Sequence, residues 1–209
     1  QEKCLAREAL VMGIPTAISF EVVTCGARTG VVYEMLNAEL LSEVIRNDLV
    51  HLEHHAKTLV SIARRIHSAK PSSKDVPSIK PRLIASIEQL RGTLLNADVQ
   101  MLHDKLASVP DAETGVHFDL HTSNIMIKDG ESMIIDLGDF SRGSWLFDLG
   151  VLYMIYGVPR LGLCERATKI PAAKGVELWQ RIEQQYFADK SPEEWTLDRK
   201  STRLNSSHT

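Results

Sequence analysis

The chain has 209 residues, 44% of them hydrophobic and 24% charged, with a formal net charge of −3. These values are typical of one medium-sized globular domain, and the acidic balance argues against a nucleic-acid-binding surface. The longest apolar stretch, FDLGVLYMIYGV, is too short to cross a bilayer, and three scattered cysteines suit neither a disulfide framework nor a zinc site, so we expect a reduced, cytoplasmic setting.

A helix and a β-hairpin are expected first in chain order. CLAREALVM has a helical pattern that stops at the turn MGIPTA, which contains Gly13 and Pro15. AISFEVVTC and VVYEML are rich in β-branched and aromatic residues and flank GARTG, which predicts an antiparallel hairpin. Residues 40–70 then have a helical period and are long enough for two helices.

The second half is mostly helical and contains one very short hairpin. PSSKDVPSIKP, residues 71–81, predicts an exposed loop, and LIASIEQLRGTLL and VQMLHDKLASV predict helices. IMI and MIID flank the Asp-Gly turn KDGE, which predicts two short strands. Helical patterns return in VLYMIYGV and VELWQRIEQQYFA. This order predicts an α+β fold with a small sheet at the front.

The two ends of the sequence differ from the rest. The chain begins with Gln1 in mid-helix, so a targeting signal upstream would not be seen. DRKSTRLNSSH resembles one reading frame of a sequencing-library adapter, and we therefore expect residues 198–209 to be an artefact. The alternative for this segment is a flexible basic tail.

The polar residues around the short hairpin form a candidate site. In HFDLHTSNIMI, Asp119 and Asn124 precede the first strand, and Asp136 closes the second. Because antiparallel strands lie about 5 Å apart, pairing IMI with MII brings Asn124 and Asp136 to one end of the ladder. One carboxylate and one amide oxygen suit Mg²⁺, which uses few protein ligands plus substrate phosphates. A protein-kinase catalytic loop has the same spacing of Asp, Asn and a second Asp.

HFDLHTSNIMI…MIIDLGDFSRGSWLFDLG resembles the signature of the aminoglycoside phosphotransferase-like kinases, a branch of the protein-kinase-like fold, especially its small bacterial members. MGIPTA, VVYEMLNA and IARRIHS resemble a turn, the nucleotide hinge and a helix end of that family, so the resemblance covers residues 2–187. It implies a partial nucleotide-binding β lobe and hinge over residues 1–36. A helical C-terminal lobe with the catalytic loop would span residues 37–197.

The resemblance also implies roles for the loop residues. Asp119 corresponds to the catalytic base, and Asn124 and Asp136 correspond to magnesium ligands. Asp148 resembles an aspartate that braces the catalytic loop from below, and His117 and His121 are expected to support the loop.

The hinge and the first helix are expected to bind the nucleotide. The family pattern places adenine against main-chain groups of Glu34 and Leu36, with Tyr33 at the gate. Glu2 falls near the helix glutamate that pairs with a strand lysine in the family, and Glu8 is a second candidate for that role.

Several positions depart from the family pattern. Phe118 stands where the family usually has Gly, and Trp145 replaces a small residue or Pro. No Gly-rich loop and no strand lysine precede Glu2, so we expect little or no activity from this polypeptide as written.

The implied function is transfer of the γ-phosphate of ATP, with Mg²⁺, to a hydroxyl of a small molecule. Aminoglycoside, choline-like, sugar and amino-alcohol acceptors fit equally, and helices after Asp148 would form their pocket. The alternatives are a catalytically impaired, kinase-like nucleotide-binding protein and a hydrolase with zinc on His117, Asp119 and His121. No pattern indicates an oligomeric state, a membrane partner or a nucleic-acid partner.

Three structural interpretations stand beside the catalytic ones. His51 and His55 lie one helical turn apart, but Leu52 stands where a zincin motif needs Glu, so we expect a solvated helix face. Cys25 has no base at a known distance and is expected to be a turn residue of the first hairpin. If Asp119 and its neighbours have no catalytic role, they would form a capped polar turn.

Overall fold

The computed structural model describes residues 2–72 and 75–188, so the expected adapter segment lies outside the described residues. The expected α+β class is confirmed. The helices are α1 (Glu2–Val11), α2 (Leu41–Asn47), α3 (Leu52–Ser68), α4 (Ile79–Gln89), α5 (Asn96–Ser108), α6 (Leu146–Leu152), α7 (Leu163–Thr168) and α8 (Ala172–Tyr186). The strands are β1 (Ser19–Cys25), β2 (Arg28–Tyr33), β3 (Glu39–Leu40), β4 (Thr114–Val116), β5 (Ile125–Lys128), β6 (Glu131–Ile134) and β7 (Ser141–Gly143).

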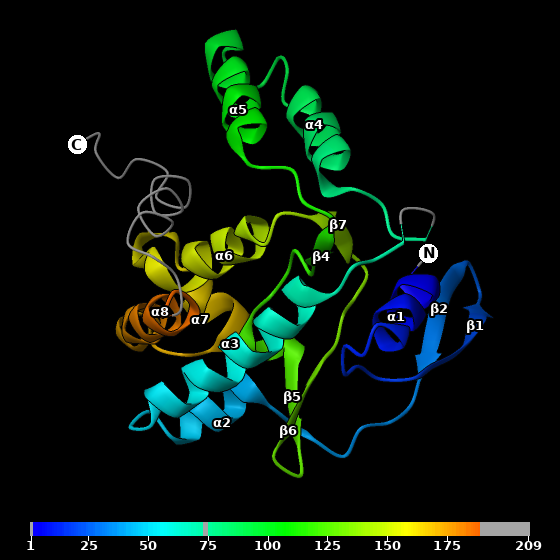
Figure 1. Cartoon of the computed structure of the whole chain (residues 1–209), viewed down its shortest axis with the longest axis vertical. Coiled ribbons are helices and arrows are strands. Elements are labelled where there is room, and N and C mark those ends of the chain that lie inside the picture. The colour runs from blue at the N-terminus through cyan, green and yellow to red at the C-terminus, as the bar shows by residue number, and fades with distance from the viewer. Residues whose placement is uncertain (1, 73–74, 189–209) are drawn as a thin grey trace.

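Helix α1 and the β1–β2 hairpin form a small unit at one side of the molecule (Figure 1). The expected helix end and hairpin are both confirmed. The helix ends before Gly13, which has a φ of 79°. Glycine adopts this positive φ at little energetic cost. A main-chain hydrogen bond of 2.8 Å from Ile134 to Pro15 joins this unit to β6. The extended segment from Glu34 to Ala38 then leads into the helical part.

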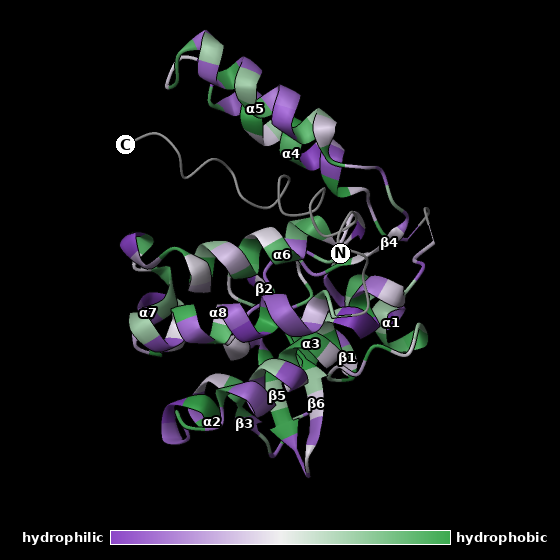
Figure 2. Cartoon of the chain, turned by 60° about the vertical axis from the view of Figure 1, so that its left-hand side comes forward, coloured by the Kyte–Doolittle hydropathy of each residue, from purple (hydrophilic) through white to green (hydrophobic). Residues whose placement is uncertain are grey.

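The helical part is built around α3, which packs along α8 (Figure 2). The two helices expected over residues 40–70 are confirmed as α2 and α3. Buried positions of α3 recur at the three- and four-residue spacing of one helix face. These positions are Leu52, His55, Ala56, Leu59, Val60, Ile62, Ala63, Ile66 and His67. No helix within residues 2–72 and 75–188 has the length and apolar character that a membrane crossing requires.

Residues 71–81 are not simply an exposed loop, and that prediction was wrong at three positions. Pro71, Val76 and Ile79 are buried, and Ile79 begins α4. The Arg142 main chain donates a 2.8 Å hydrogen bond to Pro77, which ties this segment to β7. Residues 73 and 74 lie outside the described residues. Helices α4 and α5 then project together from the body as an arm (Figures 1 and 2).

Two small sheets hold the polar loop in place. The expected hairpin is confirmed as β5–β6, with Ile125 opposite Ile134 and with β3 added beside β5. Asp129 and Gly130 at its turn have φ values of 51° and 82°, the positive pair that a type I′ turn needs. The second sheet, β4–β7, was not expected from the sequence. Residues 117–124 therefore run from β4 to β5 with both ends anchored.

Candidate functional site

Asp119 and Asn124 contact each other within the loop between β4 and β5. The Asn124 side-chain amide nitrogen donates to the Asp119 main-chain oxygen at 2.9 Å and to its Oδ2 at 3.1 Å. Asn124 is buried, whereas 48% of the Asp119 side chain is exposed. Within the described part of the chain, Asn124 Oδ1 accepts no hydrogen bond, so this oxygen can take a cation.

His121 favours the ionised form of Asp119. Its Nε2 lies 3.7 Å from Asp119 Oδ2. This contact, followed by the hydrogen bond from Asn124, holds the pKa of the Asp119 carboxyl below its usual value although partial burial raises it. Asp119 is therefore an ionised, half-exposed carboxylate at neutral pH, which is the form that can accept a proton.

Asp136 reaches the same end of the hairpin as Asn124, as the expected strand pairing required. The Ile135 N–H donates to the Asn124 main-chain oxygen at 2.9 Å, and Asp136 is the next residue. Its φ of 59° turns the chain out of β6, and the residue is exposed. An amide oxygen and a carboxylate thus stand at one edge of the loop, a donor set that suits a hard divalent cation.

Asp148, at the start of α6, holds the loop from the buried side. Its Oδ1 accepts from the Phe118 N–H at 2.6 Å, and its Oδ2 accepts from the His117 N–H at 2.9 Å. The side chain is fully buried. Because the Asp148 carboxylate accepts hydrogen bonds from two adjacent main-chain N–H groups, it fixes the direction of the backbone just before Asp119.

His67 on α3 extends this contact, and the sequence interpretation gave it no role. Its Nε2 donates to Asp148 Oδ2 at 3.0 Å, while its Nδ1 accepts from the Tyr186 hydroxyl at 2.7 Å. Tyr156 was missed as well. Its buried hydroxyl lies 3.0 Å from the Thr122 main-chain nitrogen and 2.8 Å from its Oγ1. The only sequence signal was the helix end IARRIHS, which contains His67.

The zinc alternative finds no support in the histidine geometry. His117 Nε2 donates to the Ile135 oxygen at 3.0 Å, and its Nδ1 accepts from the Asp119 N–H at 3.2 Å, so both ring nitrogens are engaged. His121 Nδ1 accepts from the Ser123 N–H. Among the residues that the structure describes, no three His, Cys, Asp or Glu side chains are grouped to hold a metal.

The expectation of a solvated face for His51 and His55 was wrong for His55. Only 3% of His55 is exposed, and its Nε2 lies 3.2 Å from the Asp48 main-chain oxygen. His51 is exposed and contacts the Asp48 carboxylate at 2.7 Å. Cys25 is exposed at the end of β1, next to the positive-φ Gly26 of the hairpin turn.

The residues expected at the nucleotide line one cavity of about 250 Å³ between the N-terminal unit and the β5–β6 hairpin. They are Glu2, Tyr33, Glu34 and Leu36, and Asp136, which was expected to bind magnesium, lines the same cavity. The Tyr33 hydroxyl donates to Glu2 Oε1 at 2.8 Å. Burial, with the nearby Glu2 and Asp136 carboxylates, raises the pKa of Tyr33 well above its usual value, so it stays a neutral donor.

Within this cavity the Glu34 N–H and carboxylate are already engaged. The N–H donates to the Ile18 oxygen at 2.9 Å, and Oε1 accepts from the Ile18 N–H at 2.8 Å. The Glu34 carbonyl and the Leu36 main chain make no hydrogen bond within residues 2–72 and 75–188. These are the groups that could pair with the edge of a base.

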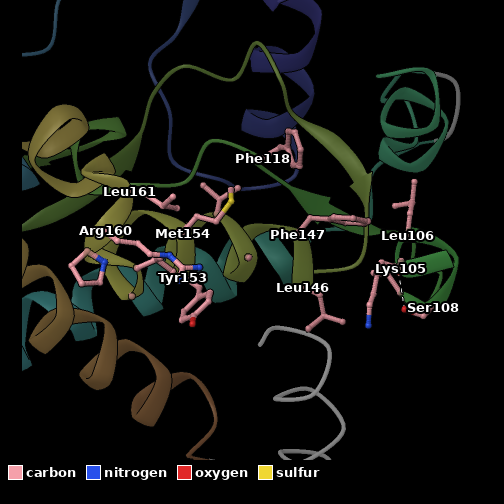
Figure 3. A pocket seen from close by; sticks show the side chains of 16 residues that line it. Lys105, Leu106, Ser108, Phe118, Leu146, Phe147, Tyr153, Met154, Arg160 and Leu161 are labelled. Atoms are coloured by element: carbon pink, nitrogen blue, oxygen red, sulfur yellow. Dashed lines mark hydrogen bonds between the residues drawn. The ribbon is translucent and has the colours of Figure 1, made fainter. Parts of the chain in front are cut away.

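A second, larger cavity of about 680 Å³ lies beside the loop (Figure 3). Residues of α5 line it on one side, and α6 with the segment that follows it lines the rest. Phe118 also borders this cavity, so the cavity reaches the residue before Asp119. The contribution of α5 was not expected from the sequence.

Phe118, which stands where the family usually has Gly, has a φ of 67°. This left-handed conformation costs a non-glycine residue about 1–2 kcal/mol. The ring contacts hold the residue there. The Arg82 guanidinium lies over the Phe118 ring at 5.0 Å from its centroid and donates to Asp139 at 2.7 Å. The ring also meets Phe147 edge-on at 6.4 Å.

A family model described as "Phosphotransferase enzyme family" matches residues 7–184. No curated protein matches the chain with significant sequence similarity. Among solved structures, a thermostable mutant of an aminoglycoside phosphotransferase, in ternary complex with ADP and hygromycin B, has a TM-score of 0.58 at 12% identity. The match covers 99% of this chain and 84% of that chain.

Two further solved structures are similar. An aminoglycoside-3'-phosphotransferase of type VIII has a TM-score of 0.55 at 17% identity, covering 96% of this chain and 78% of that chain. A choline kinase from Streptococcus pneumoniae has a TM-score of 0.53 at 15% identity, covering 93% of this chain and 65% of that chain. At these identities the likeness concerns the fold, and the expected protein-kinase-like architecture is confirmed.

Proposed function

The chain belongs to the phosphotransferase enzyme family, and from this premise we propose that the complete protein transfers the γ-phosphate of ATP to a hydroxyl group of a small molecule. The reaction would take place in the cytoplasm, where ATP is available. Residues 1–36 would form the nucleotide-binding lobe, and residues 37–197 the helical lobe with the catalytic loop.

ATP would bind in the cavity of about 250 Å³ between these lobes. The unengaged Glu34 carbonyl and Leu36 N–H would pair with the adenine edge. Tyr33 is held by Glu2 and would close the side of the adenine pocket. Asp136 lines the same cavity, so the phosphate end of the nucleotide would lie toward the loop.

Asn124 Oδ1 and the Asp136 carboxylate would hold Mg²⁺. The donor set fits, because the Asn124 amide nitrogen is turned toward Asp119 and its oxygen is left for the cation. The bound ion would neutralise charge on the phosphates during transfer. The Asn124–Asp119 hydrogen bond would couple the position of this metal ligand to the position of the base.

Asp119 would accept the proton of the acceptor hydroxyl. An oxygen–phosphorus bond to the γ-phosphate then forms as the bond from that phosphorus to the leaving ADP oxygen breaks, so ADP departs with the electron pair. The contact with His121 stabilises the carboxylate form of Asp119, and Asp148 fixes the backbone before it. The acceptor would bind in the larger cavity, whose walls include helix α6 after Asp148 and which Phe118 connects to the base.

The observation that carries this proposal is the convergence of Asp119, Asn124 and Asp136 at one end of the β5–β6 hairpin, beside a cavity. The test is Asp119→Asn in the complete protein. We expect acceptor-dependent ATP consumption to fall by about 10²–10⁴-fold while ADP affinity is unchanged. Turnover that survives the substitution would mean that Asp119 is not the base.

A further inference from the structure

The lining of the larger cavity is mostly apolar, which is unusual for the site of an acceptor with several amino groups. Most of its walls are aliphatic or aromatic, with Phe118, Phe147 and Met154 among them (Figure 3). Its volume of about 680 Å³ is in the range of sites for drug-sized molecules. Such a lining binds the apolar body of a ligand and leaves few polar groups to fix its orientation.

Among the described residues that line the cavity, the charged side chains are all cationic. Lys105 of α5 and Arg160 lie on opposite sides of the cavity (Figure 3), and no Asp or Glu within residues 2–72 and 75–188 lines it. Neither cation forms an ion pair with any residue in the described ranges 2–72 and 75–188. Besides Asp119, three acidic residues lie close to lining residues in the sequence. Asp111 pairs with Lys80, and Asp148 is buried and bonded to His67 and to the loop backbone. Asp104, next to Lys105, is exposed and accepts a 2.9 Å hydrogen bond from the Gln100 side chain.

A polycationic acceptor would therefore meet repulsion from Lys105 and Arg160 and no compensating carboxylate among the described residues of these walls. The Asp119 carboxylate is the acid next to Phe118, and it is already paired with His121 and Asn124. An anionic group, by contrast, would find two unpaired cations, while an apolar body would fill the space between them.

We propose that the acceptor of this enzyme is a hydroxyl compound with an apolar body and an anionic group, and that it is not a polycation such as an aminoglycoside. This inference rests on the proposed function. The hydroxyl would lie at the Phe118 end of the cavity, near Asp119, and the anion would lie toward Lys105 or Arg160.

Three probes of equal chain length separate the effect of charge from that of apolar burial. They are hydroxydecanoate, decanediol and aminodecanol, each with a hydroxyl at one end and a carboxylate, a hydroxyl or an ammonium group at the other. Dissociation constants are measured by calorimetry, with Mg²⁺ and ADP present. We expect the carboxylate to bind about tenfold more tightly than the ammonium compound, and the diol to lie between them.

Charge-reversing variants locate the effect. Lys105→Glu with Arg160→Glu should remove or invert the preference for the carboxylate, because the wall then repels it. Arg28→Glu is the matched control, since Arg28 is exposed on the β1–β2 hairpin and carries the same charge. It should leave the order unchanged. Met154→Asn, at an exposed lining residue, should weaken all three probes.

Three results would overturn the proposal: tighter binding of aminodecanol or hygromycin B than of hydroxydecanoate, an equal effect of the Arg28→Glu control, or no effect of Met154→Asn. The ADP affinity measured in the same samples keeps this outcome apart from a failure of the proposed function. If ADP binds and the probes follow the wrong order, the acceptor class is wrong and the phosphotransferase assignment stands. If ADP does not bind, the proposed function itself fails.

Discussion

Asp148→Asn tests how much the buried brace beneath the catalytic loop contributes to stability. The Asp148 carboxylate accepts three hydrogen bonds, from the His117 and Phe118 N–H groups and from the His67 ring. Asparagine has one acceptor oxygen. If that oxygen keeps the two bonds at the Oδ2 position, the new NH₂ group faces the Phe118 N–H, and two donors then meet in a fully buried place.

The cost follows from these bonds. A buried donor left unsatisfied costs about 1–3 kcal/mol, and each of the two retained bonds loses about 1 kcal/mol when its acceptor becomes neutral. We therefore expect the free energy of unfolding to fall by about 4 kcal/mol. For a chain of this size that corresponds to a melting temperature lower by roughly 10 °C.

Thermal unfolding followed by circular dichroism measures the change, and urea unfolding provides the free energy. Asp129→Asn is the matched control, because the same chemical change is made at an exposed type I′ turn position where Asn is favoured. Its effect should stay within about 0.5 kcal/mol. If Asp148→Asn melts like this control, the carboxylate does not hold the loop and the account of the brace is refuted.

Two further predictions concern the base and the packing of β4. His121→Ala should raise the pKa of Asp119 toward its usual value, as measured by carboxyl carbon NMR, and an unchanged titration would refute the contact. Because the pKa of Asp119 is lower in the folded state, the ionised carboxylate stabilises the fold at pH values above its ordinary pKa. This stabilisation is lost as the pH falls through the folded pKa. In His121→Ala the loss of stability in acid should therefore be smaller. Gly115→Ala should destabilise the protein by about 1–3 kcal/mol in urea unfolding, since the new Cβ would lie 2.6 Å from the Ile66 main-chain oxygen. Gly150→Ala, with open space at its Cβ, should instead gain up to about 1 kcal/mol, and equal losses in both variants would contradict the packing.

The local parts of the site could be predicted from the sequence because short-range rules determine them. The Asp-Gly turn fixes the register of β5–β6, and that register brings Asn124 and Asp136 to one edge. Helices α3, α5 and α8 were predictable for the same reason, since their apolar period is a local property. The short helix α7 was not predicted, and the helix expected over residues 83–95 ends at Gln89.

The parts that were missed depend on contacts between distant residues. His67 and Asp148 are 81 positions apart, so no local pattern joins them. The strands β4 and β7 have three residues each, too few for an alternating pattern. The Pro-, Ser- and Lys-rich composition of residues 71–81 indicated a loop, but tertiary packing buries Val76 and Ile79 within it. The same kind of packing buries the face of α3 that contains His55.

Magnesium-dependent ADP binding tests the central claim most directly. Calorimetry would compare the unaltered chain with Asp136→Asn and with the control Asp129→Asn, each with and without Mg²⁺. Asn tolerates the positive φ of Asp136, so the variant should fold. We predict that Mg²⁺ tightens ADP binding in the unaltered chain and in the control, and that Asp136→Asn loses most of this gain. No binding of ADP, or an unchanged magnesium effect in Asp136→Asn, would contradict the account.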